Sequence, residues 1–450
     1  MHKSKRPYVL PKRLTCDSAE VDKGITLKMV EDYIRKHNAM FSRYNYLEAL
    51  YRGFHDVYKE PEKEDWKPDN RLAVNFPRYM TETFTGYGYG IPIRVTHPDD
   101  NINERIQEFG KANEITDHEA EMVKLCCIYG HAWEYLYQDE ETNTKITAFS
   151  PKEVFTVYDD TLKNKAVFSV RYGYHELENK DWQAYGEIMT REEIISFDEG
   201  TIKERKPNPY GFIPVVEWKL NEECMGLYEE VAGLIEAYNH TIGEKANDVD
   251  AFAEAYLAVL GAELDEDGVY KIRDNRIINL YGTDDAKDVL VQFLQKPTAD
   301  DTQENLLNRL ENLIYQTSMV ANISDETFGN AASGVALAYK LQAMSNLALT
   351  FDRKIEKSLR KRYKIFSSLS TNVPNQDAWR DIEIQTTRNL PKNIAEETQI
   401  ATQLEGVVSK ETQLGVLSIV PDPQAEIEKM EEKDETDQAS IVEKRMFDMN

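Results

Sequence analysis

The chain has 450 residues, a hydrophobic fraction of 41% and a formal net charge of −26 at pH 7. This length predicts about two to four domains, and we expect a folded protein. No apolar run approaches the roughly 20 residues of a membrane span, and no signal-peptide core is present. We therefore expect a protein without membrane contact that is made and used in cytosol. The acidic balance argues against a protein that grips nucleic acid by its phosphates, so nucleic acid is either irrelevant or passes without being held.

Helical and strand-like patterns alternate along the first half of the chain. Residues 24–57 carry apolar side chains at helical spacing. Residues 71–95 indicate a short strand and a helix with a stop at Gly86, and 89–96 are a second strand candidate. Helix returns at about 101–129. Between residues 131 and 218, β-branched and aromatic runs are broken by turn residues, which predicts a mainly β block between helices.

The second half predicts two helices with a small strand-rich segment between them. Residues 225–257 are helical, with apolar side chains mostly on one stripe, and a compact segment at about 258–296 holds several strand candidates. A second helix follows at 300–319. One helix therefore leads out of the β block and another leads back, which is the order of a stalk with a tip.

A small, polar loop at 320–334 precedes the longest predicted helix, which has no Pro or Gly from Val335 to about Leu369. At 1.5 Å per residue, such a helix spans about 50 Å. We expect its apolar stripe, and the stripe on 227–256, to need more apolar cover than one chain supplies. The stripe of the long helix consists of Leu337, Leu341, Met344, Ala348, Phe351, Ile355 and Leu359.

The C-terminal region predicts one isolated strand followed by short helices. The strand lies within "RDIEIQTTRNLP" (380–391). The helices are separated at Ser409 and Pro421, and Ser409 stands three residues before Thr412 as a polar cap. The last, charged residues are expected to fray.

Several fragments suggest chemistry, but each is better explained as structure. "DHEAEM" at 117–122 begins like a zinc-protease helix, yet Met122 stands where a second His is required, so we expect a surface helix. "GYGYGIP" at 86–92 follows a helix and precedes a strand, which favours a helix C-cap over a phosphate-binding loop. Asp159 and Asp160 favour a turn between strands over a cation site.

The cysteines and histidines give no metal-binding pattern. Cys16, Cys126, Cys127 and Cys224 lack metal-type spacing, and none of the eight His has a partner at such spacing. Cys126 and Cys127 lie in an apolar run, so we expect two buried hydrophobic side chains rather than a vicinal disulfide. The sequence therefore predicts no active site.

Five segments, taken together and in order, resemble the portal proteins of long-tailed (siphovirus-type) bacteriophages, the head-to-tail connector portal family. The resemblance extends from about residue 24 to residue 432, and the order of the segments makes it specific although each segment alone is weak. The segments are 72–93, 234–261, 306–316, "FGNAASGVALAYKLQAM" (328–344) and the tail 387–415.

The resemblance implies an α+β, portal-type fold with an α/β wing, a two-helix stem, a small β-containing clip, a long wing helix and a short helical crown. It also implies that the protein is not an enzyme. From the absence of motifs we expect no catalytic residue, cofactor or metal. The expected parts are the wing 1–224, the first stem helix 225–252, the clip 253–297, the second stem helix 298–320, the tunnel loop 321–334, the long wing helix with its strand 335–392, and the crown with its charged tail 393–450.

A portal implies a homo-oligomeric ring, usually a dodecamer, at one vertex of the phage head. The expected locations are the virion and, during assembly, the host bacterial cytoplasm. Such a ring would seed head assembly with the major capsid or scaffold protein, dock the terminase large subunit and join head-to-tail connector (adaptor) proteins. It would conduct double-stranded DNA during packaging and ejection, and an acidic tunnel would keep this DNA centred and unbound.

Two sets of residues carry the contacts that the resemblance implies. Basic clip residues are expected to dock terminase and connector proteins, with an ordinary solvated face as the alternative; they are Lys271, Arg273 and Arg276. Tunnel-loop residues are expected to lie around the channel axis and touch moving DNA, although Phe328 could instead anchor the loop in the wing core. These loop residues are Asn322, Asp325, Glu326, Thr327, Phe328 and Asn330.

Two other classes of protein stay open on the residues alone. A phage enzyme acting on nucleic acid, such as a nuclease, would need carboxylates that converge on Mg²⁺ in one pocket. A minor capsid or scaffold-like protein would share the acidity and the helices, but it would lack the order of stalk, clip and loop.

Overall fold

The computed structural model describes most of the chain and contains both helices and sheets, which agrees with the α+β class. Two compact units divide the chain, Met1–Phe328 with Tyr339–Arg388 and Gly329–Ala338 with Asn389–Asn450. No helix within the described ranges has both the length and the hydropathy of a membrane span. The described residues are 13–17, 24–64, 67–176, 182–253, 257–260, 277–279, 290–293, 300–323, 334–389, 394–417 and a few positions between 419 and 430.

The N-terminal helical region consists of two helices, α2 (Leu27–Asn38) and α3 (Phe41–Tyr51), where the sequence predicted one helical stretch up to residue 57. The side chain of Thr26 caps α2 by accepting a hydrogen bond from a backbone N–H of the first turn. The buried face of α2 packs on a six-stranded sheet, whereas α3 directs Tyr44 toward the end of α6 (Ile115–Tyr129). The break between the helices therefore gives each its own packing partner.

Helix α4 (Phe76–Tyr89) corrects two predictions. Residues 72–75 form no strand, and the helix continues through Gly86, the predicted stop, although it does end with a C-cap inside the glycine-rich run. A glycine inside a helix costs about 1 kcal/mol relative to alanine, but burial of most of the helix outweighs this cost. At Gly88 an added Cβ would lie 3.8 Å from the Cβ of Ala348, an ordinary contact distance, which places this part of α4 directly against the longest helix.

The predicted helix at 101–129 is divided into α5 (Asp100–Ala112) and α6. The division occurs at Glu114, whose φ of 47° lies in the left-handed region. Before α5, β2 (Arg94–Thr96) pairs antiparallel with β14 (Glu383–Gln385). The strand that was predicted as isolated therefore has a partner far away in the sequence.

The β block forms two sheets, one of six strands in the order β1-β5-β6-β7-β8-β9 and one of three in the order β10-β3-β4. Strands β3 to β7 and β10 confirm the predicted runs. Strand β9 was missed because all its residues are exposed, so it has no apolar alternation. The strands are β1 (Leu14–Cys16), β3 (His131–Gln138), β4 (Thr144–Phe149), β5 (Val154–Asp159), β6 (Ala166–Glu176), β7 (Trp182–Met189), β8 (Glu193–Asp198), β9 (Thr201–Pro207) and β10 (Val215–Lys219).

Two local predictions in this region are confirmed. Asp159 ends β5, and Asp160 begins the turn toward β6. Cys126 and Cys127 are free thiols with no exposed surface on α6, and burial raises the pKa of both. They therefore act as small hydrophobic side chains.

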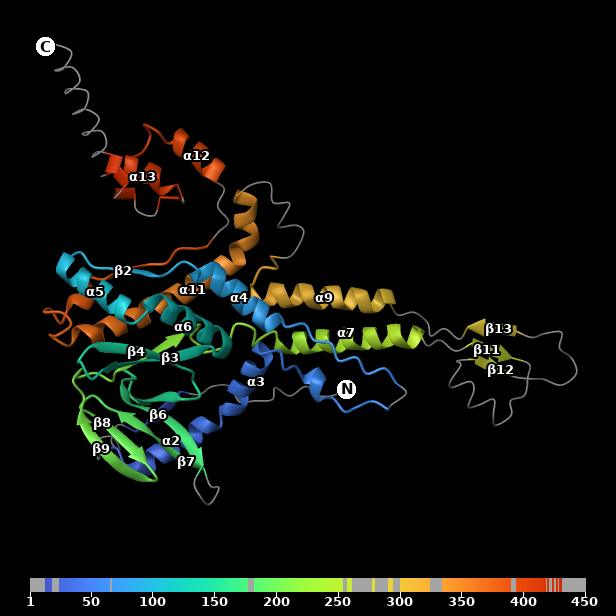
Figure 1. Cartoon of the computed structure of the whole chain (residues 1–450), viewed down its shortest axis with the longest axis horizontal. Helices are drawn as coiled ribbons and strands as arrows, with labels where there is room; N and C mark the ends of the chain where they lie inside the picture. The colour runs from blue at the N-terminus through green and yellow to red at the C-terminus, as the bar shows by residue number, and fades with distance from the viewer. Residues whose placement is uncertain are drawn as a thin grey trace, which may run out of the picture. The chain divides into compact units, whose positions relative to one another are not determined.

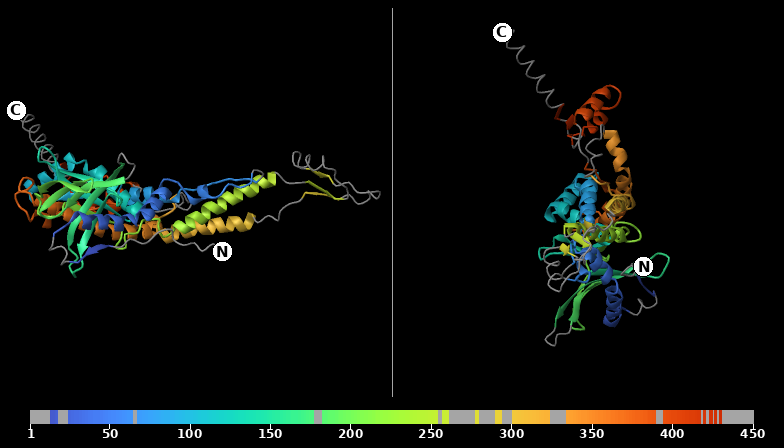
Figure 2. Two further views of the ribbon diagram at one scale, coloured as in Figure 1. Left: turned by 90° about the horizontal axis from the view of Figure 1, so that it is seen from below. Right: turned by 90° about the vertical axis from the view of Figure 1, so that its right-hand side faces the viewer.

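Helices α7 (Ala232–Ala253) and α9 (Asp300–Ser318) lie side by side (Figures 1 and 2). Between them along the chain, three short strands form a sheet in which β11 pairs parallel with β12 and antiparallel with β13. Strands β12 and β13 were predicted, β11 was missed although most of it falls in the segment predicted as strand-rich, and the candidate at 268–274 lies outside the described residues. The strands are β11 (Leu257–Leu260), β12 (Ile277–Asn279) and β13 (Leu290–Phe293).

Helix α11 (Gly334–Ser367) is the longest helix, as predicted. Its apolar stripe from Leu341 to Leu359 is at most 5% exposed at each stripe position. The ring centroid of Phe351 lies 6.4 Å from that of Phe84 and 5.2 Å from that of Tyr89, both on α4. The expectation that this part of the stripe needs cover from outside the chain was therefore wrong, because α4 packs on it.

The second unit contains the short helices α12 (Ile394–Gln403) and α13 (Lys410–Gly415). The side chain of Ser409 accepts a hydrogen bond from the backbone N–H of Thr412 at 3.3 Å, so the predicted cap is confirmed. The side chain of Gln413 donates to the carbonyl of Ala401 at 2.7 Å and joins the two helices.

A fully buried arginine on α11, Arg362, connects three elements. Its Nε donates to both carboxylate oxygens of Glu134 on β3 at 3.0 Å, and its Nη1 donates to Glu119 on α6 at 2.5 Å. The Nε2 atom of His118 lies 2.7 Å from Glu134. Residues 117–122 form part of a helix, as predicted, and three of the six are exposed, but the side chains of His118 and Glu119 are buried because their side of α6 packs toward β3 and α11.

The charges in this cluster shift the pKa values of its two acids in opposite directions. Burial alone would raise the pKa of Glu134, but Arg362 and His118 outweigh burial and hold this pKa at about 2. The pKa of Glu119 is raised, because there burial outweighs the attraction of Arg362. The stabilisation that Glu134 contributes is complete above its ordinary pKa of 4.5 and is lost as the pH falls through about 2.

Replacing Arg362 by leucine should lower the free energy of unfolding by about 3–5 kcal/mol at neutral pH, because two carboxylates would stay buried without their cation. Arg360, two residues away, is partly exposed and pairs with Glu356, so Arg360→Leu should cost less than about 1 kcal/mol. Urea unfolding at equal protein concentration would measure both. The difference between the variants should shrink on acidification, since protonation removes the unpaired charge; equal stabilities at neutral pH would contradict this assignment.

Candidate functional site

The paired helices α7 and α9 bury part of their apolar surface and expose the rest. Ile235 and Ile314 have no exposed surface, and Leu310 is 8% exposed. By contrast, Val249 is 61% exposed and Leu306 is 45% exposed. Exposed branched side chains beside a buried stripe are typical of a surface that a partner covers.

An irregular segment, residues 55–64 and 67–75, runs along α7 and is bonded to polar side chains of that helix (Figure 1). It includes the 3-10 helix η1 (Asp56–Lys59). At Gly243 of α7, an added Cβ would lie 2.9 Å from the carbonyl oxygen of Asn70, so glycine permits the close approach. The bonds, at 2.6–3.1 Å, join His55 Nδ1 and Asp56 N to Glu236, Lys63 Nζ to Glu244, Asn70 N to Asn247 and Val74 N to Asn239.

A buried ion pair fixes the turn that leads into α7. Arg43 of α3 donates to Glu229 from Nε at 2.8 Å and from Nη2 at 2.6 Å, and neither side chain is exposed. The same Nη2 donates to the backbone carbonyls of Tyr129 and Cys224 at 3.1 and 2.7 Å. One guanidinium therefore joins the end of α6 to this turn, and α7 begins at Ala232 rather than at the predicted residue 225.

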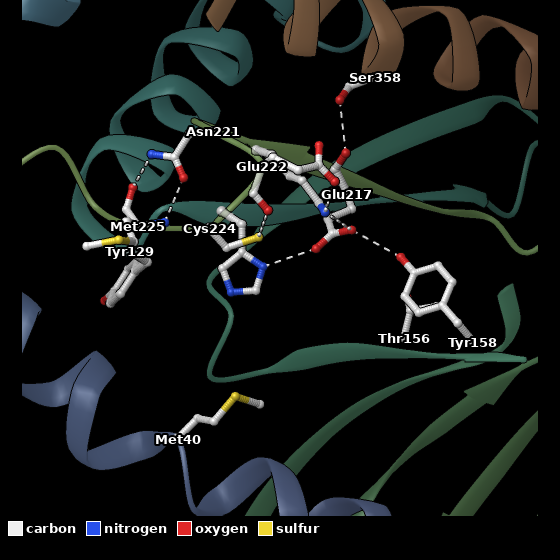
Figure 3. Close-up of polar contacts among 12 residues, drawn as sticks. Met40, Tyr129, Thr156, Tyr158, Glu217, Asn221, Glu222, Cys224, Met225 and Ser358 are labelled. Atoms are coloured by element: carbon white, nitrogen blue, oxygen red, sulfur yellow. Dashed lines mark hydrogen bonds and ion pairs between the residues drawn. The ribbon is translucent and has the colours of Figure 1, made fainter. Parts of the chain in front are cut away.

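Beside this turn, His131 of β3, Glu217 of β10 and Cys224 bring their side chains together. Figure 3 labels Glu217 and Cys224 in this group. Strands β3 and β10 pair antiparallel with Lys219 opposite His131, which places Glu217 diagonally across on the same face. Nδ1 of His131 lies 3.2 Å from Oε1 of Glu217, and Tyr158 donates its hydroxyl to Oε2 at 3.0 Å. Sequence analysis missed this group because its members come from three separate segments.

Nearby charges and burial shift the pKa values of this group in opposite directions. Burial would raise the pKa of Glu217, but His131 and Lys219 outweigh burial and hold this pKa at about 2. Burial raises the pKa of the Cys224 thiol to about 12. On the other side of β10, the hydroxyl of Ser358 on α11 donates to the backbone carbonyl of Glu217 at 2.9 Å, so the strand is also tied to the longest helix.

The chain leaves α9 through Met319, whose φ of 59° is left-handed. The backbone N–H of Ile323 then donates to the hydroxyl of Tyr79 at 2.9 Å, and the amide of Asn322 donates to Glu311 at 3.2 Å. These bonds hold the start of the predicted tunnel loop against α4 and α9. A hollow of about 390 Å³ lies here, and its lining includes Tyr315, Met319, Asn322, Lys340 and Met344.

The comparisons with known proteins identify the family. The family model described as "Phage portal protein, SPP1 Gp6-like" matches residues 30–440. The chain belongs to this portal protein family. The portal protein of Bacillus phage SPP1 is 23% identical over 444 residues, which cover 92% of this chain and 87% of that protein. The resemblance noted in the sequence is thereby confirmed for the family, which is one of structural proteins rather than enzymes.

The structure describes only one of the residues predicted to contact DNA or partners in this portal-family chain. Asn322 is half-buried and bonded to Glu311 on α9. The other tunnel-loop residues and all three clip residues lie outside the described residues. They are Asp325, Glu326, Thr327, Phe328 and Asn330 in the loop, and Lys271, Arg273 and Arg276 in the clip.

Proposed function

We propose that this portal-family chain assembles into a closed ring, with twelve copies as the expected number, at one vertex of a phage capsid. Exposed apolar side chains on α7, on α11 and at α9 support a ring. In a ring, one surface of each copy contacts a different surface of the next copy, so these side chains would be buried in every copy. They are Val249, Leu306, Met319, Tyr339 and Leu349, which are 45–77% exposed.

In this proposal the ring conducts double-stranded DNA during packaging and ejection. DNA carries one negative charge per about 1.7 Å of helix axis, so basic walls would hold it through many phosphate contacts. The net charge of −26 per chain favours the opposite behaviour, in which the walls repel DNA and keep it centred.

Each part of the chain then has a role in the ring. Helices α7 and α9 form the stem, and the small sheet between them belongs to the clip. The proposed parts keep the boundaries expected from the sequence, with the wing at 1–224, the stem helices within 225–252 and 298–320, the clip at 253–297, the tunnel loop at 321–334, the long wing helix and strand at 335–392 and the crown with its charged tail at 393–450.

The two alternative classes have less support than a portal. A nuclease would need converging carboxylates, whereas the group of metal-ligating side chains found among the described residues contains one carboxylate. A minor capsid or scaffold-like protein would not account for a family match over residues 30–440.

A matched pair of substitutions on α9 tests the ring. Leu310→Asp should destabilise the chain itself by several kcal/mol, because the carboxylate would be buried without a partner. Leu306→Asp, one turn earlier at an exposed position, should leave the fold intact and prevent ring closure. Circular dichroism would measure the fold, and native mass spectrometry would count subunits. A wild-type protein that stays a monodisperse monomer at high concentration would contradict the ring, and normal rings of Leu306→Asp would remove this face from the interface.

We also propose that the clip docks the terminase large subunit and connector proteins through its basic residues. Changing Lys271, Arg273 and Arg276 together to Glu should weaken terminase binding at least tenfold and leave the ring intact. The control is the same change at three exposed basic residues of β9, Lys203, Arg205 and Lys206, which should have no effect. Pull-down with purified terminase measures the binding, and unchanged binding of the clip variant would remove these residues from the docking site.

The tunnel loop is proposed to touch moving DNA through short polar side chains and Phe328. Gly334→Pro should stiffen the loop and spare α11, because Gly334 is the first residue of that helix and proline suits a first helical position. Rings should form normally, while the length of packaged DNA falls. Full-length packaging in virions that carry this change, with the ring confirmed by electron microscopy, would show that the loop is no DNA-contacting element.

A further inference from the structure

Three side chains of different chemistry face one point at the start of the turn into α7. We propose that His131, Glu217 and Cys224 bind one divalent transition-metal ion, with Zn²⁺ as the best match. The possible ligand atoms of these residues all lie within 4.8 Å of one another. Imidazole, carboxylate and thiolate together are ligands typical of Zn²⁺, whereas Mg²⁺ and Ca²⁺ prefer oxygen alone. This inference goes beyond the portal role and does not depend on it.

The spacing of two ligands already fits a bound ion. A tetrahedral Zn²⁺ with bonds of about 2.0–2.1 Å to nitrogen and oxygen separates these two atoms by about 3.3 Å. Nδ1 of His131 and Oε1 of Glu217 are 3.2 Å apart. A Zn–S bond of about 2.3 Å requires the sulfur within about 3.6 Å of both, so the Cys224 side chain would move inward by at most about 1.2 Å. Water would fill the fourth position.

The remaining polar atoms of two ligands are occupied by other groups. Oε2 of Glu217 accepts from Tyr158 at 3.0 Å and lies 3.6 Å from Nζ of Lys219 (Figure 3). Nε2 of His131 lies 3.1 Å from the hydroxyl of Tyr44. Metal-binding histidines and carboxylates are oriented by such partners, which leave one atom of each side chain for the ion.

The backbone holds Cys224 in place for this role. Its φ of 55° is left-handed, and its carbonyl accepts from Arg43 at 2.7 Å. At Gly130, directly before His131, an added Cβ would lie 2.1 Å from the carbonyl oxygen of Cys224, so the turn packs on the backbone there. A strained cysteine that is held by two independent contacts is typical of a functional position.

The protons balance on binding. The thiol of Cys224 loses its proton to solvent and binds as thiolate. Nδ1 of His131 would bind the ion through its lone pair, so the ring proton would lie on Nε2 and be donated to the hydroxyl of Tyr44. Since the ligands come from β3, β10 and the turn before α7, the ion would stabilise the connection between the β block and the paired helices.

The test uses the untagged full-length protein with Zn²⁺ or Co²⁺ as the probe. Equilibrium dialysis followed by metal analysis should find one ion per chain. Cys224→Ser should weaken binding at least 100-fold and abolish the Co²⁺–thiolate charge-transfer absorption. The control is Cys16→Ser, at a buried cysteine outside the group, which should keep both. Tyr44→Phe should keep the absorption and weaken binding by about 10–100-fold, as expected for a partner that orients a ligand.

Two outcomes would overturn the proposal. One is wild-type protein that binds no Co²⁺ with thiolate absorption, which would leave the group as a hydrogen-bonded cluster only. The other is equal metal binding by wild type and by folded Cys224→Ser, which would indicate adventitious surface binding. If Cys224→Ser does not fold, the spectrum of wild-type protein decides, since it reports thiolate ligation directly.

Discussion

Burial of the Arg362 guanidinium is the constraint on which the position of α11 depends. An apolar stripe attracts without direction, so the stripe alone would let a helix of 34 residues shift along α4 by a turn. Arg362 removes this freedom, because its donors match the carboxylates of Glu134 and Glu119 in one arrangement only. Buried ion pairs contribute little net stability, but separating them leaves uncompensated charge, and we infer that the pair sets the register. The start of the helix, and hence the end of the preceding loop, follows from that register.

A second buried arginine has the same effect at the start of α7. Arg43 contacts the end of α6, the turn at Cys224 and Glu229, so three segments meet at one guanidinium. Two long helices, α7 and α11, are thus each fixed to the β block by a buried arginine. This arrangement also explains why His131 and Cys224 are adjacent: the contacts that direct α7 are the contacts that form the His131–Glu217–Cys224 group.

Periodic patterns within single segments allowed much of this fold to be predicted. Features that depend on contacts between distant segments could not be predicted. The helices α9 and α11 and the cap at Ser409 follow from local spacing, which one segment contains in full. The helix stop predicted at Gly86 was wrong because the packing of α4 on α11 outweighs the low helix propensity of glycine. The burial of Glu119 within 117–122 was not predicted, because its cation, Arg362, lies on a helix more than two hundred positions later. For the same reason, the His131–Glu217–Cys224 group has no sequence signal, since metal-ligand spacing is recognisable only when the ligands share a segment.

The distribution of polarity on α7 provides a further argument for a covered surface. In a monomer, a helix buries its apolar residues and exposes its polar ones. Helix α7 instead buries Asn239 and Asn247 under the segment that runs along it, while Val249 stays 61% exposed. The side-chain oxygens of both amides accept hydrogen bonds from backbone N–H groups of this segment, which offsets part of the cost of burying them. The segment therefore occupies the polar face and leaves apolar side chains for contacts outside the chain, which a ring of identical copies would supply.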